Sequence, residues 1–253
     1  MNERLEAFGD WFVDGDWPDA TCPTCGVGNL RVDSIGQHET FVSEDSRTHD
    51  AWEPEWVRGF FAAILRCQRS KCREIVIASG EWRVRDRPFV NWENPDAQME
   101  YDDQYRLQTT IPPLPIMTDV DFCPQPVQDA QTKASQVIGV DPGAAGNRLR
   151  LAVELALDAV EIPRSGGSAH ARIKLLHAKN AEAAKYLEAV KWIGNQATHE
   201  DSLSVSDVLE AARILHRALA LLFDPTVGAI DRRTQEIIDA RGLPKTLLGD
   251  LPT

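Results

Sequence analysis

Apolar and polar positions follow two different patterns along the chain, and the pattern changes near residue 124. Before it, short apolar runs are separated by turn residues and are rich in β-branched and aromatic residues, which is typical of strands. These runs are "LRVDSI", "FFAAILRC" and "REIVIASGEWRVR". Within the last of them, "ASGEW" is predicted to form a hairpin turn between two strands.

After residue 124, apolar residues recur at spacings of three and four, which predicts amphipathic helices. The segments are "PVQDAQTKASQVIG", "AAGNRLRLAVELALDAVEI", "SAHARIKLLHAKN", "AEAAKYLEAVKWIGNQATHE", "SVSDVLEAARILHRALALLF" and "GAIDRRTQEIIDARG". Ser204 or Ser206 is a suitable N-cap for the fifth of them. Short connections favour antiparallel neighbours, so we expect an up-and-down bundle of about four or five helices.

These two apolar patterns predict an α+β chain with two domains. A β-rich domain is expected at residues 1–90 and an all-α bundle at residues 124–253. Residues 91–123 between them are rich in proline, and "TTIPPLPIMTDVDFCPQP" is too dense in proline for a helix or a central strand. We interpret residues 91–123 as a linker.

Charge is distributed unevenly between the two halves. The net charge is −12, and residues 1–140 hold 13 Lys and Arg against 24 Asp and Glu, whereas residues 141–253 hold 14 against 15. The total argues against simple electrostatic capture of nucleic acid, but it leaves room for a local basic face. No apolar run approaches the roughly 20 residues of a membrane span, and no signal peptide is visible, so we expect a cytoplasmic protein without a membrane partner.

Four of the five cysteines form two short pairs. Cys22 and Cys25 lie in "CPTCG", and Cys67 and Cys72 lie in "CQRSKC". Two such pairs separated by strands are typical of a zinc ribbon, in which four thiolates hold one structural Zn²⁺ per chain and leave no position for a catalytic water. The alternative is that the pairs are ordinary reduced thiols. Cys123 is expected to be an ordinary buried or linker thiol.

The segment "EWRVRDR" places arginines at alternating positions of a predicted strand, and therefore on one face. Arg83, Arg85 and Arg87 can form a surface that follows phosphates, with Trp82 available for stacking. They can equally form a solvated face paired with Glu74, Glu81 and Asp86, and we favour this reading because the domain is acidic.

The segment "KWIGNQATHE" interrupts a good helix with a Gly-Asn pair. Glycine inside a helix costs about 1 kcal/mol relative to alanine, so packing or chemistry should compensate. Lys191, Asn195 and His199 recur every four residues and would share one face of a continuous helix. Gly194 beside them would permit the close approach of another helix or of an RNA backbone.

The helical half resembles the domain-of-unknown-function family 4145, a branch of the HEPN superfamily. The resemblance is carried by "KWIGNQATH" and by Arg150 and Glu154 in "RLRLAVE". It implies a HEPN-like bundle that forms a homodimer and, in active members, cleaves RNA without metal at the dimer interface. Active members carry an arginine followed after four to six residues by histidine, whereas here seven residues separate Lys191 from His199.

Two functions are therefore expected. The first is a nucleic-acid-directed protein resembling prokaryotic defence or toxin HEPN proteins, a metal-independent endoribonuclease acting on RNA such as tRNA. There His199 would be acid or base, Lys191 and Asn195 would contact the phosphate, and Arg150 and Glu154 would come from the facing helix. The second is a non-catalytic adaptor for protein partners, in which the same residues form a polar network that fixes helix register. Binding of a small ligand is a third, weaker reading.

Overall fold

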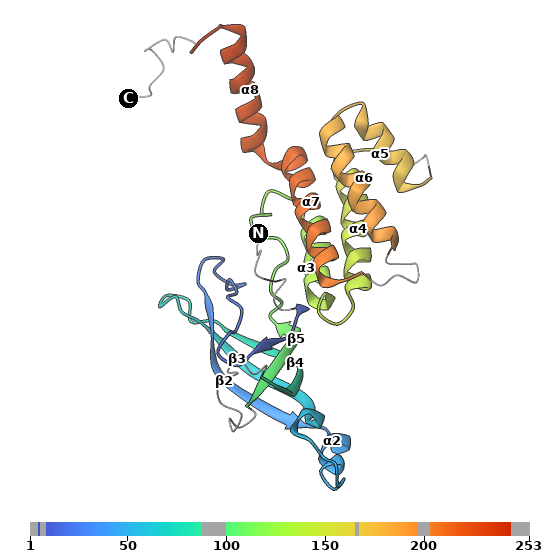
Figure 1. The fold of residues 1–253 in the computed structure, drawn as a ribbon. Coiled ribbons are helices and arrows are strands. Elements are labelled where there is room, and N and C mark those ends of the chain that lie inside the picture. The colour runs from blue at the N-terminus through green and yellow to red at the C-terminus, as the bar shows by residue number, and fades with distance from the viewer. Residues whose placement is uncertain (1–4, 6–8, 88–99, 165–166, 197–202, 244–253) are drawn as a thin grey trace, which may run out of the picture.

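The computed structural model describes residues 5, 9–87, 100–164, 167–196 and 203–243. The first part of the chain forms an antiparallel sheet of five strands, and helices α3 to α8 follow it (Figure 1). This confirms the α+β class, with the sheet before the helices.

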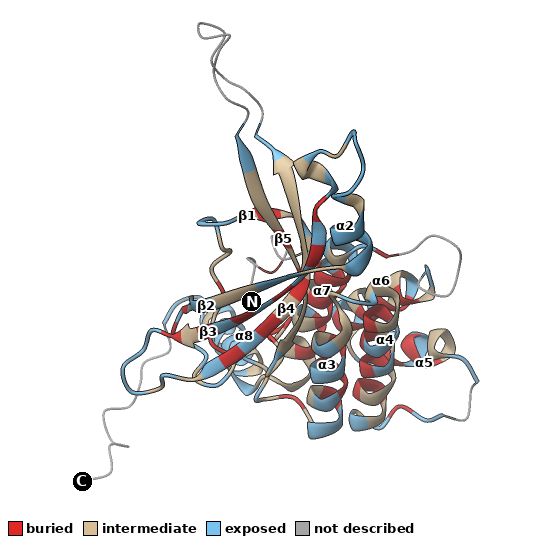
Figure 2. Cartoon of the chain, turned by 90° about the horizontal axis from the view of Figure 1, so that it is seen from below, coloured by how far each residue is buried: buried red, intermediate tan, exposed pale blue. Residues whose placement is uncertain are grey.

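The sheet has the strand order β1-β5-β4-β3-β2. Its strands are β1 (Phe12–Val13), β2 (Leu30–Glu39), β3 (Arg58–Cys67), β4 (Ile75–Asp86) and β5 (Tyr101–Ile111). Burial alternates along β3, as expected for a sheet with one covered face (Figure 2). The covered face holds an aromatic cluster of Phe12, Trp17, Phe61 and Tyr105. Burial raises the pKa of Tyr105 to about 12, and its hydroxyl accepts a hydrogen bond of 2.6 Å from Gln37.

Two sequence expectations fail in this sheet. "ASGEW" is not a hairpin turn, because β4 runs through it without a break. Gly80 instead marks an irregularity in the pairing of β4 with β5, where an added Cβ would lie 2.0 Å from the carbonyl oxygen of Arg106. The segment interpreted as a linker contains β5, which pairs with β4 along most of its length and is therefore part of the sheet.

A short excursion connects β2 to β3. It comprises helix α2 (Phe41–Ser46) and the 3-10 helix η2 (Pro54–Trp56). The hydroxyl of Thr40 caps α2 by accepting a hydrogen bond from the Ser43 amide, and the Ser43 hydroxyl donates to the carbonyl oxygen of Trp56. These bonds hold the excursion against the start of β3.

The predicted helices are present. Their bounds are α3 (Gln125–Val137), α4 (Pro142–Ala159), α5 (Ala169–His177), α6 (Ala181–Gln196), α7 (Val205–Phe223) and α8 (Pro225–Asp239). Ser204 caps α7 in a capping box with Asp207. Helix α8 extends away from the other helices and buries none of its residues (Figure 1). Among the described residues, no helix is both long and apolar enough to cross a membrane.

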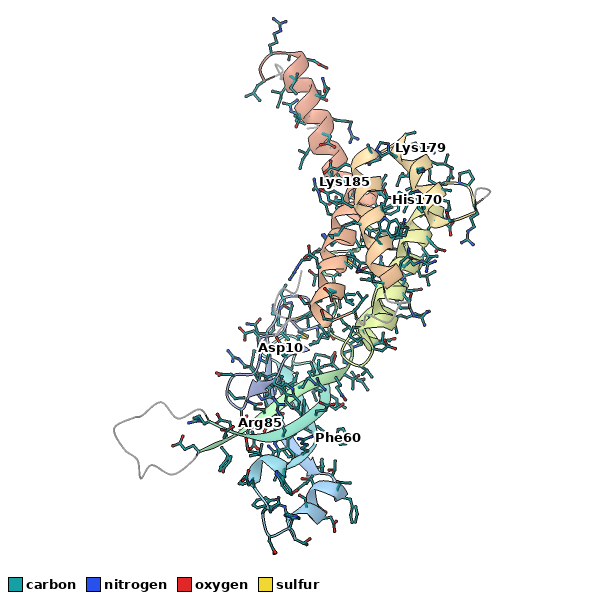
Figure 3. All side chains as sticks on the ribbon, turned by 45° about the vertical axis from the view of Figure 1, so that its right-hand side comes forward. Asp10, Phe60, Arg85, His170, Lys179 and Lys185 are labelled. Carbon is teal, nitrogen blue, oxygen red and sulfur yellow. The ribbon has the colours of Figure 1, made fainter. Side chains whose placement is uncertain are left out.

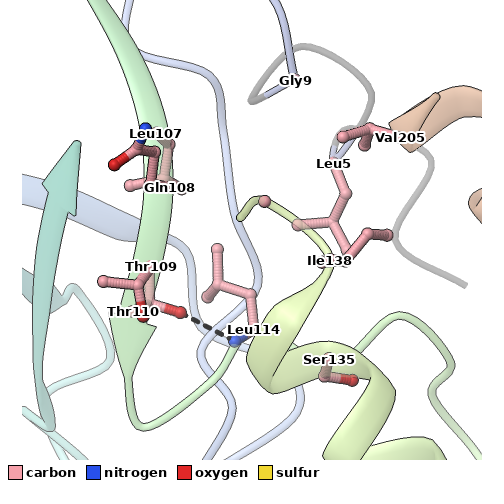
Figure 4. A pocket seen from close by; sticks show the side chains of 11 residues that line it. Leu5, Gly9, Leu107, Gln108, Thr109, Thr110, Leu114, Ser135, Ile138 and Val205 are labelled. Atoms are coloured by element: carbon pink, nitrogen blue, oxygen red, sulfur yellow. Dashed lines mark hydrogen bonds between the residues drawn. The ribbon is translucent and has the colours of Figure 1, made fainter. Parts of the chain in front are cut away.

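The sheet and the helices meet where β5 ends. The backbone of β5 lies against the end of α3, since a Cβ on Gly139 would lie 2.4 Å from the carbonyl oxygen of Gln108. A small apolar pocket of about 40 Å³ remains at this junction, beside the hydrogen bond of 3.0 Å from the Leu114 amide to the Thr110 hydroxyl (Figure 4). Such a volume is enough for very few water molecules, so we assign this pocket to packing and not to ligand binding.

Candidate metal centre and bundle cleft

The four paired cysteines converge at one end of the sheet. All four sulfur atoms lie within 4.8 Å of one another, with Cys22 Sγ 3.9 Å from Cys72 Sγ and Cys25 Sγ 3.8 Å from Cys67 Sγ. Cys67 closes β3, whereas the other three lie in the turns before β2 and β4. The predicted cluster is thus confirmed, and its geometry can hold a metal ion.

Residues with a left-handed backbone conformation shape the turns around this cluster. Gly26 follows the first pair with φ of 67°, and Arg73 follows the second pair with φ of 53°. Gly28 lies so close that an added Cβ would be 2.4 Å from Cys67 Sγ, and its amide lies 3.4 Å from Cys25 Sγ. Only glycine fits there while the four sulfurs keep their positions.

The thiols differ in their electrostatic surroundings. Burial raises the pKa of Cys22 to about 12, whereas hydrogen bonds from the backbone amides of Val27 and Gly28 lower the pKa of Cys25 to about 6. Four thiolates this close repel one another, so a cation is needed to deprotonate them all. Cys123 is buried apart from the cluster, and burial raises the pKa of its thiol to about 11, as expected for an unreactive thiol.

Lys191 is buried between α5 and α6, where it joins a small polar cluster. Its Nζ lies 3.5 Å from Nδ1 of His170 and 3.9 Å from Oε1 of Glu188, and it covers the ring of Trp192 at 3.8 Å. His170 Nδ1 lies 3.0 Å from the same Glu188 oxygen. Because the carboxylate is the closer partner, we assign a proton to Nδ1 of His170, which donates a hydrogen bond to Glu188. The other ring nitrogen, Nε2, then carries no proton and can act as a base. Figure 3 labels His170 on the helical half.

Gly194 brings α6 against α4. A Cβ at this position would lie 2.9 Å from the Cβ of Arg150 and 3.2 Å from the carbonyl oxygen of Gly146. Arg150 reaches along α4 to Glu154, with 3.8 Å between Nη2 and Oε1. The close approach of another helix at Gly194 is therefore present, and that helix is α4.

A hollow of about 320 Å³ opens between α4 and the beginning of α5. It is lined by Arg150, Glu154, Arg164, Gly167, Ser168, Ala169 and Arg172. Ser168 and Ala169 at the start of α5 line the hollow, and its three arginines are balanced by Glu154 and by Asp158, which binds Arg164 and Arg172. Because positive side chains outnumber negative ones and a helix N-terminus favours negative charge, the hollow suits an anion such as a phosphate group. His170 follows Ala169 on α5 and belongs to the Lys191 cluster, but it does not itself line the hollow. We define the hollow and the Lys191 cluster together as the bundle cleft.

Arg172 lines the hollow of the bundle cleft, and its buried side chain is held by hydrogen bonds. Its side chain is 4% exposed and donates to Asp158 at 2.7 Å and to the carbonyl oxygen of Ile162 at 2.7 Å. Arg164 also binds Asp158. The hydrogen bond from Arg164, aided by that from Arg172 and opposed by partial burial, lowers the pKa of Asp158 to about 2. Nε of Arg172 is buried without a hydrogen-bond partner.

The predicted site residues are only partly brought together. Arg150 and Glu154 line the cleft, Lys191 joins it through His170, and Asn195 lies in the last turn of α6, where it has an interaction partner. His199 lies outside the described residues. Sequence reasoning assigned no role to His170 or Arg172, because their partners Glu188, Lys191 and Asp158 lie on other helices.

Arg83 and Arg85 of β4, and Arg87 directly after it, find acidic partners only in part. Arg87 pairs with Asp102 and Glu100, and Arg85 lies 3.8 Å from Glu55. Arg83 stacks on Trp11 at 3.8 Å and donates from Nε to Gln104. The partners are thus mostly different from the acids expected from sequence.

Comparisons with known families match the sheet region and the helical region separately. Residues 10–108 match the model of a family described as Domain of unknown function (DUF8608). Residues 132–240 match the model of a family described as Domain of unknown function (DUF4145). No curated protein and no solved structure matches the chain. The sheet region and the helical region are therefore each similar to a separate domain family, and the helical match agrees with the resemblance seen in the sequence.

Proposed function

We propose that this protein cleaves RNA without a metal ion in the bundle cleft, and that its helical domain is a HEPN-like bundle acting as a homodimer. The observation that carries the proposal is that Arg150 and Glu154 share one hollow with Arg172 and the first turn of α5. The match of residues 132–240 to the same family that the sequence resembles supports the assignment of the bundle. Prokaryotic defence or toxin systems are the setting that this resemblance suggests.

Each group of the bundle cleft has a role in such a reaction. Arg150 and the α5 amides would hold the phosphate and stabilise the charge that develops on it. His170, oriented by Glu188, would take the proton of the 2'-hydroxyl at Nε2. Lys191, with Nζ 3.9 Å from Oε1 of Glu188, would help to hold that carboxylate in place beside His170. Asn195 and His199 stay candidates for orienting the phosphate and protonating the leaving oxygen, from the same chain or from a second copy.

The test compares RNA cleavage by wild type, Arg150→Gln and His170→Ala in EDTA. Arg148 provides the matched control, because it lies on α4 two residues from Arg150, is exposed and does not line the hollow. We expect both cleft variants to lose cleavage by tenfold or more while Arg148→Gln keeps it and all remain folded, since one acid-base group contributes roughly 10²-fold to 10⁴-fold. Equal cleavage by all four proteins would refute the role of the cleft.

We further propose that the metal of the cysteine cluster is one structural Zn²⁺ per chain. Zinc held tetrahedrally at about 2.3 Å by four thiolates requires sulfur separations of about 3.8 Å, and two of the separations are 3.8 and 3.9 Å. Bound zinc would neutralise the thiolates and tie the ends of β2, β3 and β4. Metal analysis of the purified chain is expected to give one zinc per chain, and iron or no metal would contradict the proposal.

A non-catalytic adaptor is the second candidate, and helix α8 favours it. This helix carries exposed Ile230 and Ile238 at 65% and 60% and buries nothing against the rest of the described chain. An unpartnered amphipathic helix is typical of a surface that binds another protein. A folded dimer that leaves RNA intact, and that dissociates on Ile230→Glu, would favour this function.

A further inference from the structure

A groove crosses the exposed face of the sheet where β3 begins. It has a volume of about 370 Å³, and its lining includes Trp11, Phe60, Arg58, Arg83 and Arg85 together with Glu55 and Glu81. A second hollow of about 350 Å³ shares Thr40 and Arg58 with the first and adds Trp56 from η2. We define the two connected hollows as the sheet groove. Figure 3 labels Phe60 and Arg85 on this part of the sheet, far along the chain from the bundle cleft.

The sheet groove holds more positive than negative side chains, with Arg58, Arg83 and Arg85 against Glu55 and Glu81. Arg58 and Arg83 are direct partners across β3 and β4, and like charges at such positions are destabilising. Neither guanidinium has a carboxylate within ion-pair distance among the described residues. Burial, followed by repulsion from Arg85, Arg106 and Arg58, lowers the pKa of Arg83.

The two acids of the groove, Glu81 and Glu55, are paired with residues other than Arg58 and Arg83. Glu81 binds Arg106 and Gln108 on the β5 side, and Glu55 lies 3.8 Å from Arg85. A like-charged pair kept together without counter-charge is expected where an anionic ligand supplies it. The net charge of −12 does not oppose this, because binding depends on the local field.

Aromatic rings alternate with the arginines along the sheet groove. Arg83 stacks at 3.8 Å on Trp11, which leaves the outer N–H groups of its guanidinium for an anion. Phe60 is 55% exposed and Trp56 is 40% exposed, beside Arg58. Rings that stack on bases, placed between cations that contact phosphates, are the elements of single-strand binding.

We propose that the sheet groove binds single-stranded RNA, with Arg58 and Arg83 on backbone phosphates and Phe60 and Trp56 against bases. The inference rests on the proposed function, because it supplies the substrate-binding surface for the RNA that the bundle cleft would cut. It concerns affinity, however, and not the cleavage step, so the two are measured separately. An acidic peptide would use the arginines without needing exposed rings.

The test measures binding of a fluorescent 12-nucleotide single-stranded RNA to the full chain in EDTA at several salt concentrations. The variants are Arg58→Gln with Arg83→Gln for the charges and Phe60→Ala for stacking. Matched controls come from the other end of the same face of β3, where Arg66 pairs with Asp33 and Ile64 is exposed; they are Arg66→Gln and Ile64→Ala. Polyglutamate of similar length serves as the competing peptide probe.

The double variant is expected to bind about tenfold more weakly or worse, and to lower the logarithmic salt slope by about 1.4, because each single-strand phosphate contact contributes about 0.7. Phe60→Ala is expected to weaken binding about fivefold or more, since one stacked base contributes at least about that factor. Both controls should bind as wild type does. Unchanged binding by the double variant, or equal competition by polyglutamate with no effect of Phe60→Ala, would overturn the proposal.

The outcomes also separate this inference from the proposed function. RNA binding that needs the sheet groove, without cleavage, would reject only the nuclease. Cleavage that needs Arg150 but is indifferent to Arg58, Arg83 and Phe60 would reject only the groove. A wild type that neither binds nor cleaves RNA would reject both.

Discussion

Gly194 of α6 lies directly against Arg150 of α4, so closely that a Cβ on residue 194 would come within 2.9 Å of the Arg150 Cβ. This contact explains why a helix with good helix formers on both sides keeps a glycine. Helix propensity is given up so that α6 can approach α4, while Lys191, one turn earlier on α6, meets His170 of α5. Helix α6 therefore packs on α4 through Gly194 and meets α5 through Lys191.

Substituting Gly194 by alanine is expected to destabilise the protein despite the better propensity of alanine. Overpacking against Arg150 and the Gly146 carbonyl should outweigh the propensity gain and leave a net loss of about 1–2 kcal/mol in unfolding free energy. Urea denaturation checks this. Gly228→Ala on exposed α8 is the control, since its Cβ would meet only the end of Arg232 at 3.6 Å. It should gain up to about 1 kcal/mol of helix stability. A Gly194→Ala protein as stable as wild type would show that α6 can shift without cost.

Removal of one cluster thiol is expected to release the metal. Cys67→Ser should lower bound zinc from one per chain to nearly none and expose the sheet end to proteolysis, because three thiolates hold zinc much less tightly than four. Metal analysis after gel filtration measures this. Cys123→Ser is the control, since Cys123 is also buried but lies outside the cluster. Retention of stoichiometric zinc by Cys67→Ser would mean that the cluster is not the site.

The ion pairs of Asp158 predict a pH-dependent contribution to stability. Its folded pKa of about 2 lies below the ordinary value near 4, so its contribution is full above about pH 5 and is lost as pH falls through about 2. Asp158→Asn should cost about 2 kcal/mol at pH 7, less than the full shift implies because the pair is partly solvated. Denaturation curves of both proteins should converge toward pH 2. An Asp231→Asn control on α8 should show no such difference, and a constant gap at all pH values would contradict the assignment.

Helix positions followed from the sequence because the information there is local. The apolar stripe of α4 and the Ser204 capping box depend on residues close together in the chain. The cysteine cluster was equally accessible, because two short pairs and a common ligand chemistry leave few alternatives. The identity of its metal could not be predicted in the same way, because the sulfur positions alone do not distinguish one soft cation from another.

Non-local pairing explains what sequence reasoning missed. Strand β5 lies in an acidic segment without strong alternation and runs directly into the proline-dense run that begins at Pro112. It becomes a strand because β4 offers a free edge. Gly80 looked like a turn residue but serves close contact with the β5 backbone. His170 meets Glu188 and Lys191 only after α5 folds back on α6, so no spacing within one helix could reveal it.

The most direct measurement is cleavage of total RNA and tRNA in EDTA by purified wild type, Arg150→Gln, His170→Ala, His199→Ala and the Arg148→Gln control, with the dimer mass of each determined. We expect wild type and Arg148→Gln to cut, and Arg150→Gln and His170→Ala to remain folded dimers that do not. Intact RNA with every dimeric protein, or cutting that persists unchanged in both cleft variants, would contradict the assignment of the bundle cleft as a ribonuclease site.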